Sequence, residues 1–176
     1  MIDDPLPFAS RPYLWMFGLL FFARSMDFLS TWIATPTLAL EGNPLAKKLG
    51  WRLGMLVNLA VCFTFAFWHL TAIIIATTGL LVAAHNFRLA WLMRSMGEEN
   101  YRSWHIEQVR QTRPALYLFC LFGQTALTAA VGAVLLLSSR FDSIAFAVGL
   151  GIIAFAAVVL FYTLLGVWRI RRRGFW

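Results

Sequence analysis

Long apolar stretches alternate along the chain with short polar segments. Four of them reach the roughly 20 residues that a helix needs to cross a bilayer, at about 12–35, 53–84, 115–137 and 144–168. They are too long and uninterrupted for β-barrel strands, which need only about 10 alternating residues. The pattern predicts an all-α integral membrane protein, folded as a four-helix bundle in a single membrane domain over residues 1–176.

The second stretch is predicted to belong to an extended helix. Asn43 followed by Pro44 is typical of a helix start, because asparagine caps free N–H groups and proline fits the first turn. No firm break follows until Gly97. Residues 85–114 are predicted to form a structured loop, either an interfacial helical hairpin with aromatic residues at headgroup depth or a docking surface for a protein partner.

Composition supports the membrane assignment. Of 176 residues, 60% are hydrophobic and 13% are charged, against about 45–50% and roughly 25% in soluble domains. The start of the chain has Asp3 and Asp4 where a secretory leader would be basic, so the first stretch is expected to remain in the mature protein. Cys62 and Cys120 lie in apolar stretches and are interpreted as small buried residues.

The net charge of +7 comes from basic residues at the ends of the apolar stretches. This distribution favours membrane anchoring over nucleic-acid binding. With four spans, ten basic residues fall on the side of both termini (Arg11, Arg88, Arg94, Arg102, Arg110, Arg113, Arg169, Arg171, Arg172, Arg173) and four on the other (Lys47, Lys48, Arg52, Arg140). The positive-inside rule then predicts an inner (plasma) membrane protein with both termini cytoplasmic.

Small and mildly polar residues recur at four-residue intervals on two of the predicted helices. Such stripes let helices approach closely, and amide side chains form hydrogen bonds across the contact. The residues predicted to pack in this way are Gly50, Gly54 and Asn58 on the second helix, and Gln124, Thr128 and Gly132 on the third.

A polar cluster is predicted where the first two helices meet. Arg24, Asp27, Ser30 and Thr31 share one helix face by their spacing, and Glu41 and Asn43 follow after a short loop. In one interpretation these groups only tie down the loop, with Glu41 near the positive end of the second helix. In the other they form one functional site at the external mouth of the bundle, since intramembrane carboxylates are functional candidates.

These residues carry a family resemblance. The segment Asp27-Phe-Leu-Ser30-Thr31, with Glu41-Gly-Asn43-Pro44 opening the next helix, resembles a group of small prokaryotic membrane proteins. That group pairs an Asp-x-x-Ser/Thr helix with a Glu-x-Asn-Pro turn, and no function is assigned to it. The resemblance covers about 20 of the 176 residues. It implies that Asp27, Glu41 and Asn43 act together, and it implies no substrate or cofactor.

Three functions are compatible with the sequence. The first is a non-catalytic subunit or partner-binding scaffold in the bilayer, assembled with a protein partner or as a homo-oligomer, because no complete catalytic motif is present. The second is a membrane enzyme or a cation-dependent site for a lipid phosphate at Asp27 and Glu41, since hard cations favour oxygen ligands. The third is an oligomeric transporter. No metal site or catalytic residue is predicted from the pattern itself.

Overall fold

The computed structural model describes residues 4–173, and Asp3 lies outside them. Over these residues the chain is helical, with no strand, which confirms the all-α class. The helices are α1 (Arg11–Ala34), α2 (Pro44–Phe65), α3 (His69–Met96), α4 (Glu98–Gln111), α5 (Pro114–Ser138) and α6 (Ile144–Arg173).

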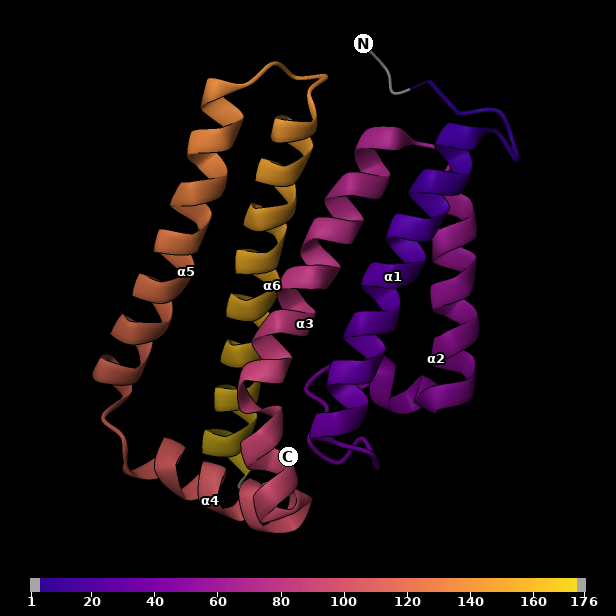
Figure 1. Cartoon of the computed structure of the whole chain (residues 1–176). Helices are drawn as coiled ribbons and strands as arrows, with labels where there is room; N and C mark the ends of the chain where they lie inside the picture. The colour runs from indigo at the N-terminus through magenta and orange to yellow at the C-terminus, as the bar shows by residue number, and fades with distance from the viewer. Residues whose placement is uncertain (1–3, 174–176) are drawn as a thin grey trace.

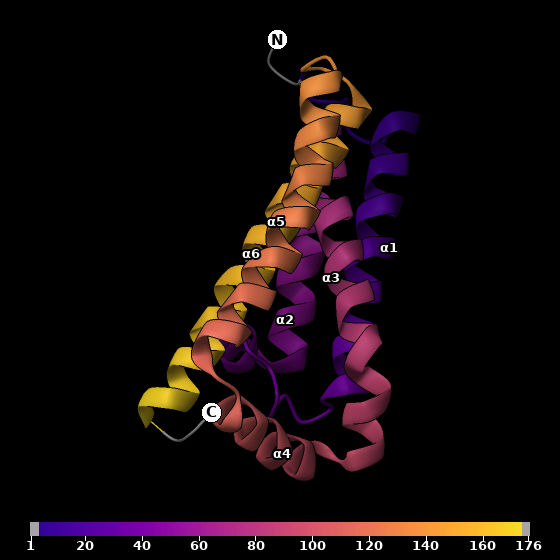
Figure 2. The ribbon, with the colours of Figure 1, turned by 90° about the vertical axis from the view of Figure 1, so that its left-hand side faces the viewer.

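All the helices except α4 run roughly along one axis (Figure 1). α1 packs along α3, α3 contacts α6, and α6 packs against α5, whereas α2 lies beside α1 at the edge of the group. α4 crosses one end of the molecule and connects α3 to α5 (Figure 2). The arrangement therefore differs from the predicted four-helix bundle, because an additional lengthwise helix is present.

The additional helix arises because the predicted extended second helix is broken. α2 ends at Phe65 and α3 begins at His69, after Trp68 adopts an extended conformation. No glycine or proline marks this turn. Contacts from the start of the chain support it instead: the Leu6 N–H donates to the Phe67 carbonyl at 2.7 Å, and the Tyr13 hydroxyl donates to the Phe63 carbonyl at 3.2 Å.

This break changes which segments share an end of the molecule. The α1–α2 loop and α4 lie at the same end, while the described N-terminal residues and the end of α6 lie at opposite ends (Figure 1). This fold does not show the predicted placement of both termini on one side of a membrane. The Glu41 loop contacts Glu98 through Thr37, so Glu41 and residues 85–114 lie at the same end of the molecule, contrary to the prediction. That segment itself comprises the end of α3, a turn at Gly97 and α4.

Within the described part of the chain, residues 4–173, three helices are long and apolar enough to cross a membrane by length and composition: α3, α5 and α6. They fit a membrane protein. α1 and α2 are outside this set; α1 contains Arg24 and Asp27, and α2 contains three basic residues near its start. Of the four predicted spans, only those at 115–137 and 144–168 correspond directly to one of these helices.

Glycines set the closest helix contacts. On α5 and α6, a Cβ added at Gly132 would lie 2.7 Å from the Gly149 carbonyl oxygen, and one added at Gly149 would lie 2.8 Å from that of Gly132. On the other face of α6, a Cβ at Gly151 would lie 2.7 Å from the Thr77 Cβ of α3. These contacts leave no room for a side chain, so they fix how α6 meets both neighbours.

The two glycines predicted to pack on α2 differ from one another. Gly54 is buried, and an added Cβ would lie 3.3 Å from the Phe28 ring of α1. Gly50 has a φ of +64° and no atom near its missing side chain. Gly50 therefore forms a kink in α2 by adopting a conformation that other residues avoid, a role that differs from the predicted helix packing.

Candidate functional site

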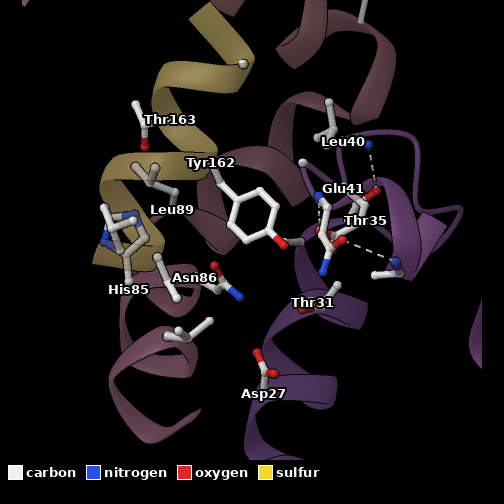
Figure 3. Close-up of a pocket in the computed structure, with 18 of the residues that line it drawn as sticks. Asp27, Thr31, Thr35, Leu40, Glu41, His85, Asn86, Leu89, Tyr162 and Thr163 are labelled. Atoms are coloured by element: carbon white, nitrogen blue, oxygen red, sulfur yellow. Dashed lines mark hydrogen bonds between the residues drawn. The ribbon is translucent and has the colours of Figure 1, made fainter. Parts of the chain in front are cut away.

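A cavity of about 1170 Å³ lies among the helices and is lined by residues from all six of them and from the α1–α2 loop. Several polar side chains point into it from separate elements (Figure 3). The polar lining residues include Arg24, Asp27, Thr31, Thr35, Glu41, Asn43, Asn58, His85, Asn86, Tyr101, Arg102, His105, Gln124, Tyr162 and Thr163. The candidate site is therefore one shared cavity.

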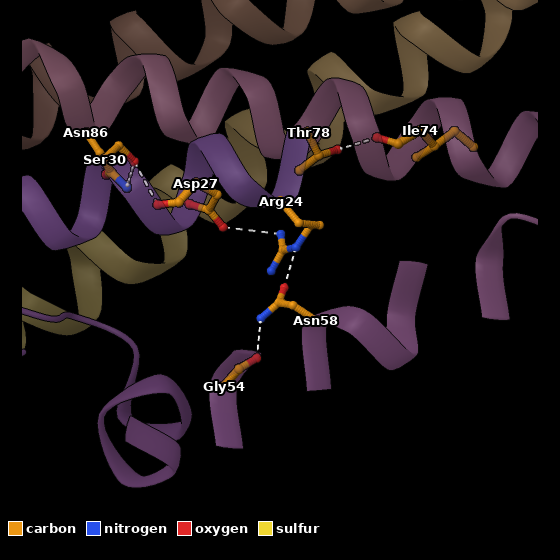
Figure 4. A network of polar contacts seen from close by, with 8 residues as sticks. All are labelled: Arg24, Asp27, Ser30, Gly54, Asn58, Ile74, Thr78 and Asn86. Atoms are coloured by element: carbon orange, nitrogen blue, oxygen red, sulfur yellow. Dashed lines mark hydrogen bonds and ion pairs between the residues drawn. The ribbon is translucent and has the colours of Figure 1, made fainter. Parts of the chain in front are cut away.

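Arg24 connects α1 to α2 on the wall of this cavity. Its Nη1 lies 3.2 Å from Oδ2 of Asp27, and its Nε donates to Oδ1 of Asn58 (Figure 4). Asn58 in turn donates from Nδ2 to the Gly54 carbonyl at 2.7 Å. The arginine is thus paired with a carboxylate and held by an amide across the helix contact, and the pair neutralises its own charge.

The remaining polar residues of that α1 face separate into two groups. Ser30 is buried; its hydroxyl donates to the Asp27 carbonyl at 2.8 Å and accepts from Asn86 Nδ2 at 3.5 Å. It does not line the cavity, whereas Thr31 does. Ser30 therefore serves the contact between α1 and α3, and Thr31 and Asp27 face the cavity.

Glu41 and Asn43 shape the cavity wall from the loop. Glu41 accepts the Asn43 N–H at 2.8 Å, and the Asn43 side chain accepts the N–H of Leu45 at 3.0 Å to cap α2. Burial raises the pKa of Glu41, and the nearby Asp27 carboxylate raises it further, against the lowering effects of the Asn43 N–H and the Lys47 ammonium group. Asp27 and Glu41 both line this cavity.

The loop is fixed against the elbow between α3 and α4. Glu98, the first residue of α4, accepts the Thr37 N–H at 3.0 Å and also the Thr37 hydroxyl. Burial acts to raise the pKa of Glu98, but hydrogen bonds from the loop residues outweigh it and lower this pKa. Trp51 Nε1 also donates to the Pro36 carbonyl at 2.9 Å. The loop that carries Glu41 is therefore held at one end of the cavity by both neighbouring elements.

Several cavity residues were not predicted from the sequence. His85 and Asn86 on α3, Tyr101 and His105 on α4, and Tyr162 on α6 all line the cavity. In the sequence, His85 and His105 are isolated histidines near the ends of an apolar stretch, and Tyr162-Thr163 is a polar pair in the last apolar stretch. Bringing them together depends on the approach of α3 to α6 at Gly151, which spacing along one helix does not reveal.

On α5, the two polar residues assigned to helix packing face different surroundings. Gln124 is exposed and lines the cavity, and the Thr128 hydroxyl donates to the Gln124 carbonyl on its own helix at 2.9 Å. Cys120 is exposed and also lines the cavity, so its predicted burial is wrong, whereas Cys62 is buried as predicted.

The donor set of the cavity suits a polar organic group better than a metal ion. Within residues 4–173, no cluster of three or more His, Cys, Asp or Glu side chains could hold a metal ion. The cavity offers amides, hydroxyls and imidazoles together with many aliphatic side chains, including Val57, Val61, Ile75, Ala154 and Val158. Such a cavity can bind a molecule with a polar head and an apolar tail.

Comparisons with protein-family models, curated proteins and solved structures found no match to this chain. The functional assignment therefore depends on the geometry of the cavity.

Proposed function

We propose that this protein is a single-domain membrane protein that binds an amphipathic, lipid-like molecule in the large cavity. The observation that carries the proposal is the mixed lining of that cavity: polar groups from several elements gather near the Glu41 loop, here called the polar end (Figure 3), and many aliphatic residues line the cavity as well. Ligand pockets in proteins have volumes of about 300–1,000 Å³ and combine mostly apolar walls with a few placed polar groups. A cavity of about 1170 Å³ accommodates a headgroup and part of an acyl or prenyl chain.

The polar end supplies the contacts for the headgroup. Glu41 and Asn86 offer acceptors and donors, and the Tyr162 hydroxyl points toward the same space (Figure 3). The Arg24–Asp27 pair lies deeper and is already neutralised. We therefore assign headgroup recognition to Glu41, Asn86 and Tyr162, and we assign to Arg24, Asp27 and Asn58 the role of holding α1 and α2 at the correct spacing.

Filling the apolar part of the cavity is expected to remove the bound molecule. Ala154→Trp combined with Val158→Trp places two indole rings in the cavity, whereas Ala157→Trp combined with Phe161→Trp places two indole rings at exposed positions of the same helix that do not line it. Native mass spectrometry of the protein extracted in mild detergent is expected to show a retained amphipathic molecule on the wild type and the exposed-position variant, and none on the cavity variant. Equal retention on all three proteins contradicts the proposal.

A second candidate function is a subunit of a membrane complex or a homo-oligomer. It is favoured by α5, which packs chiefly against α6 and exposes an apolar row comprising Phe119, Leu127, Val131, Val134 and Leu137. A lipid-facing helix has the same composition. The same mass spectra distinguish the two functions, because a subunit retains a second protein chain, whereas a lipid-binding protein retains only a small molecule.

We further propose that the α4 end of the molecule faces the cytoplasm of an inner (plasma) membrane. In this fold that end carries Lys47, Lys48, Arg52, Arg88, Arg94, Arg102, Arg110, Arg113, Arg169, Arg171 and Arg172, and the opposite end carries Arg11 and Arg140. Eleven basic residues against two support this orientation by the positive-inside rule. If α1 and α2 also lie in the bilayer, the N terminus is then external.

Cysteine labelling in intact cells tests this orientation. In a variant without Cys62 and Cys120, a cysteine at exposed Asp142 in the α5–α6 loop is expected to react with a membrane-impermeant maleimide from outside. A cysteine at exposed Arg110 of α4 is expected to react only after the membrane is opened. The reverse pattern places α4 outside and excludes the proposed orientation.

A further inference from the structure

A second, smaller cavity adjoins the large one. It has a volume of about 320 Å³ and is lined by Glu41, Pro44, Lys47, Lys48 and Arg169. Glu41 lines both cavities, so the smaller one lies at the boundary of the polar end of the larger one. Its basic residues come from two elements far apart in the sequence, the start of α2 and the last turns of α6.

The charges around this small cavity are not balanced. Three cationic side chains face one carboxylate, which leaves a net charge of +2 at neutral pH if all four groups are ionised. Within residues 4–173, neither Lys48 nor Arg169 has an ion pair or a hydrogen bond from its side chain, and the Lys47 ammonium group donates only to the Ala39 carbonyl, at 3.3 Å. Bringing like charges together is unfavourable, and an anion bound among them relieves that repulsion.

The backbone at the start of α2 adds little to anion binding. Pro44 has no N–H, and the N–H groups of Leu45 and Ala46 both donate to the Asn43 side chain, at 3.0 and 3.5 Å. The Lys47 N–H donates to the Asn43 carbonyl at 3.0 Å. With these donors used by the cap, the lysine and arginine side chains are the groups available to an anion, and three cationic donors suit a phosphate with several acceptor oxygens.

We propose that Lys47, Lys48 and Arg169 bind the phosphate group of a ligand at this small cavity. If the phosphate belongs to the headgroup of the amphipathic molecule in the large cavity, the inference rests on the proposed function. The tail of that molecule then lies between α2, α5 and α6. A free phosphate has the same chemistry, and the experiment separates the two sources.

The test uses the full chain in an uncharged detergent at fixed ionic strength. Its thermal unfolding midpoint, followed by tryptophan fluorescence, is measured during titration with dioleoyl phosphatidic acid, with dioleoylglycerol, which lacks the phosphate, and with inorganic phosphate. Phosphatidic acid is expected to raise the midpoint at lower concentration than dioleoylglycerol. If inorganic phosphate raises it equally well, the site takes a free phosphate; if only the lipid does so, the site takes a headgroup.

Charge variants decide whether these three side chains are responsible. Lys47→Gln, Lys48→Gln and Arg169→Gln together are expected to weaken phosphatidic acid binding by roughly a hundredfold, since each cation near an acidic headgroup contributes about fivefold. The matched control, Arg88→Gln, Arg94→Gln and Arg110→Gln, removes the same charge at exposed positions that line neither cavity, and it is expected to bind as the wild type does.

The outcomes also separate this inference from the proposed function. Equal loss in both triple variants shows a general surface attraction and overturns the phosphate site, as does an unchanged response of the Lys47, Lys48 and Arg169 variant. If dioleoylglycerol binds the wild type and that variant alike, the large cavity works independently of the phosphate site. If neither lipid binds the wild type, the proposed function fails, and the inorganic phosphate titration alone still decides the phosphate site.

Discussion

Asp27→Asn is expected to destabilise the protein by about 3 kcal/mol, the lower end of the cost of leaving one partner of a buried ion pair without the other. The Arg24 and Asp27 side chains are 28% and 18% exposed, so most of their surface is removed from solvent. In the variant, Arg24 has only neutral acceptors beside it, Asn58 among them, and no carboxylate to balance its charge. Unfolding in mixed micelles with increasing denaturing detergent measures the change.

The double variant Arg24→Gln with Asp27→Asn is expected to recover much of this loss, because it removes both charges together. Asp142→Asn serves as the control, since Asp142 is an exposed carboxylate in the α5–α6 loop. If the single and double variants are equally destabilised, the Asp27 carboxylate acts through something other than Arg24. If both are as stable as the wild type, the pair does not contribute to folding.

The double variant also separates the two interpretations of the Arg24–Asp27 pair. Under the roles proposed above, the pair positions α1 and α2, so a folded double variant retains the amphipathic molecule. Loss of that molecule from a protein of normal stability instead makes Asp27 part of the binding surface. The native mass spectrum of the cavity experiment provides this measurement directly.

Two local sequence signals predicted helix ends correctly. The Asn43-Pro44 cap begins α2, and Gly97 separates α3 from α4. These signals are local, because a capping side chain or a fixed φ acts within one turn of the residue that carries it. For the same reason, the apolar stretches indicated the lengths of α5 and α6 within a few residues.

The turn between α2 and α3 could not be predicted in this way. Its sequence, Phe65-Ala-Phe-Trp-His69, favours continuation of the helix, and the turn is stabilised by residues about fifty positions earlier or more. The rings of Tyr13 and Phe67 lie 4.9 Å apart, and those of Phe8 and Tyr13 lie 5.4 Å apart. Such tertiary contacts override local propensity, and this one turn moves the Glu41 loop to the end of the molecule that holds α4.

The sequence predicted the parts of the candidate site that lie within a single helix or within one loop. Helical spacing placed Arg24 and Asp27 on one face, and sequence proximity placed Glu41 beside Asn43. The partners on α3, α4 and α6 were missed because their approach depends on interhelical contacts. The end of the molecule predicted to be the external mouth is the α4 end, which we propose faces the cytoplasm. The difference arises because the turn between α2 and α3 reverses the direction of the chain.

The α1–α2 loop and the α3–α4 elbow lie at one end of the molecule and line one cavity. Crosslinking Thr37→Cys to Glu98→Cys in a variant without Cys62 and Cys120 tests this arrangement, because the Thr37 and Glu98 side chains are in hydrogen-bond contact. A short bifunctional thiol reagent is expected to join this pair within one chain in native membranes, and not the control pair Thr37→Cys with Ser143→Cys at opposite ends. A crosslink in the control pair with none between positions 37 and 98 places the loop and α4 on opposite sides of the membrane and contradicts the account.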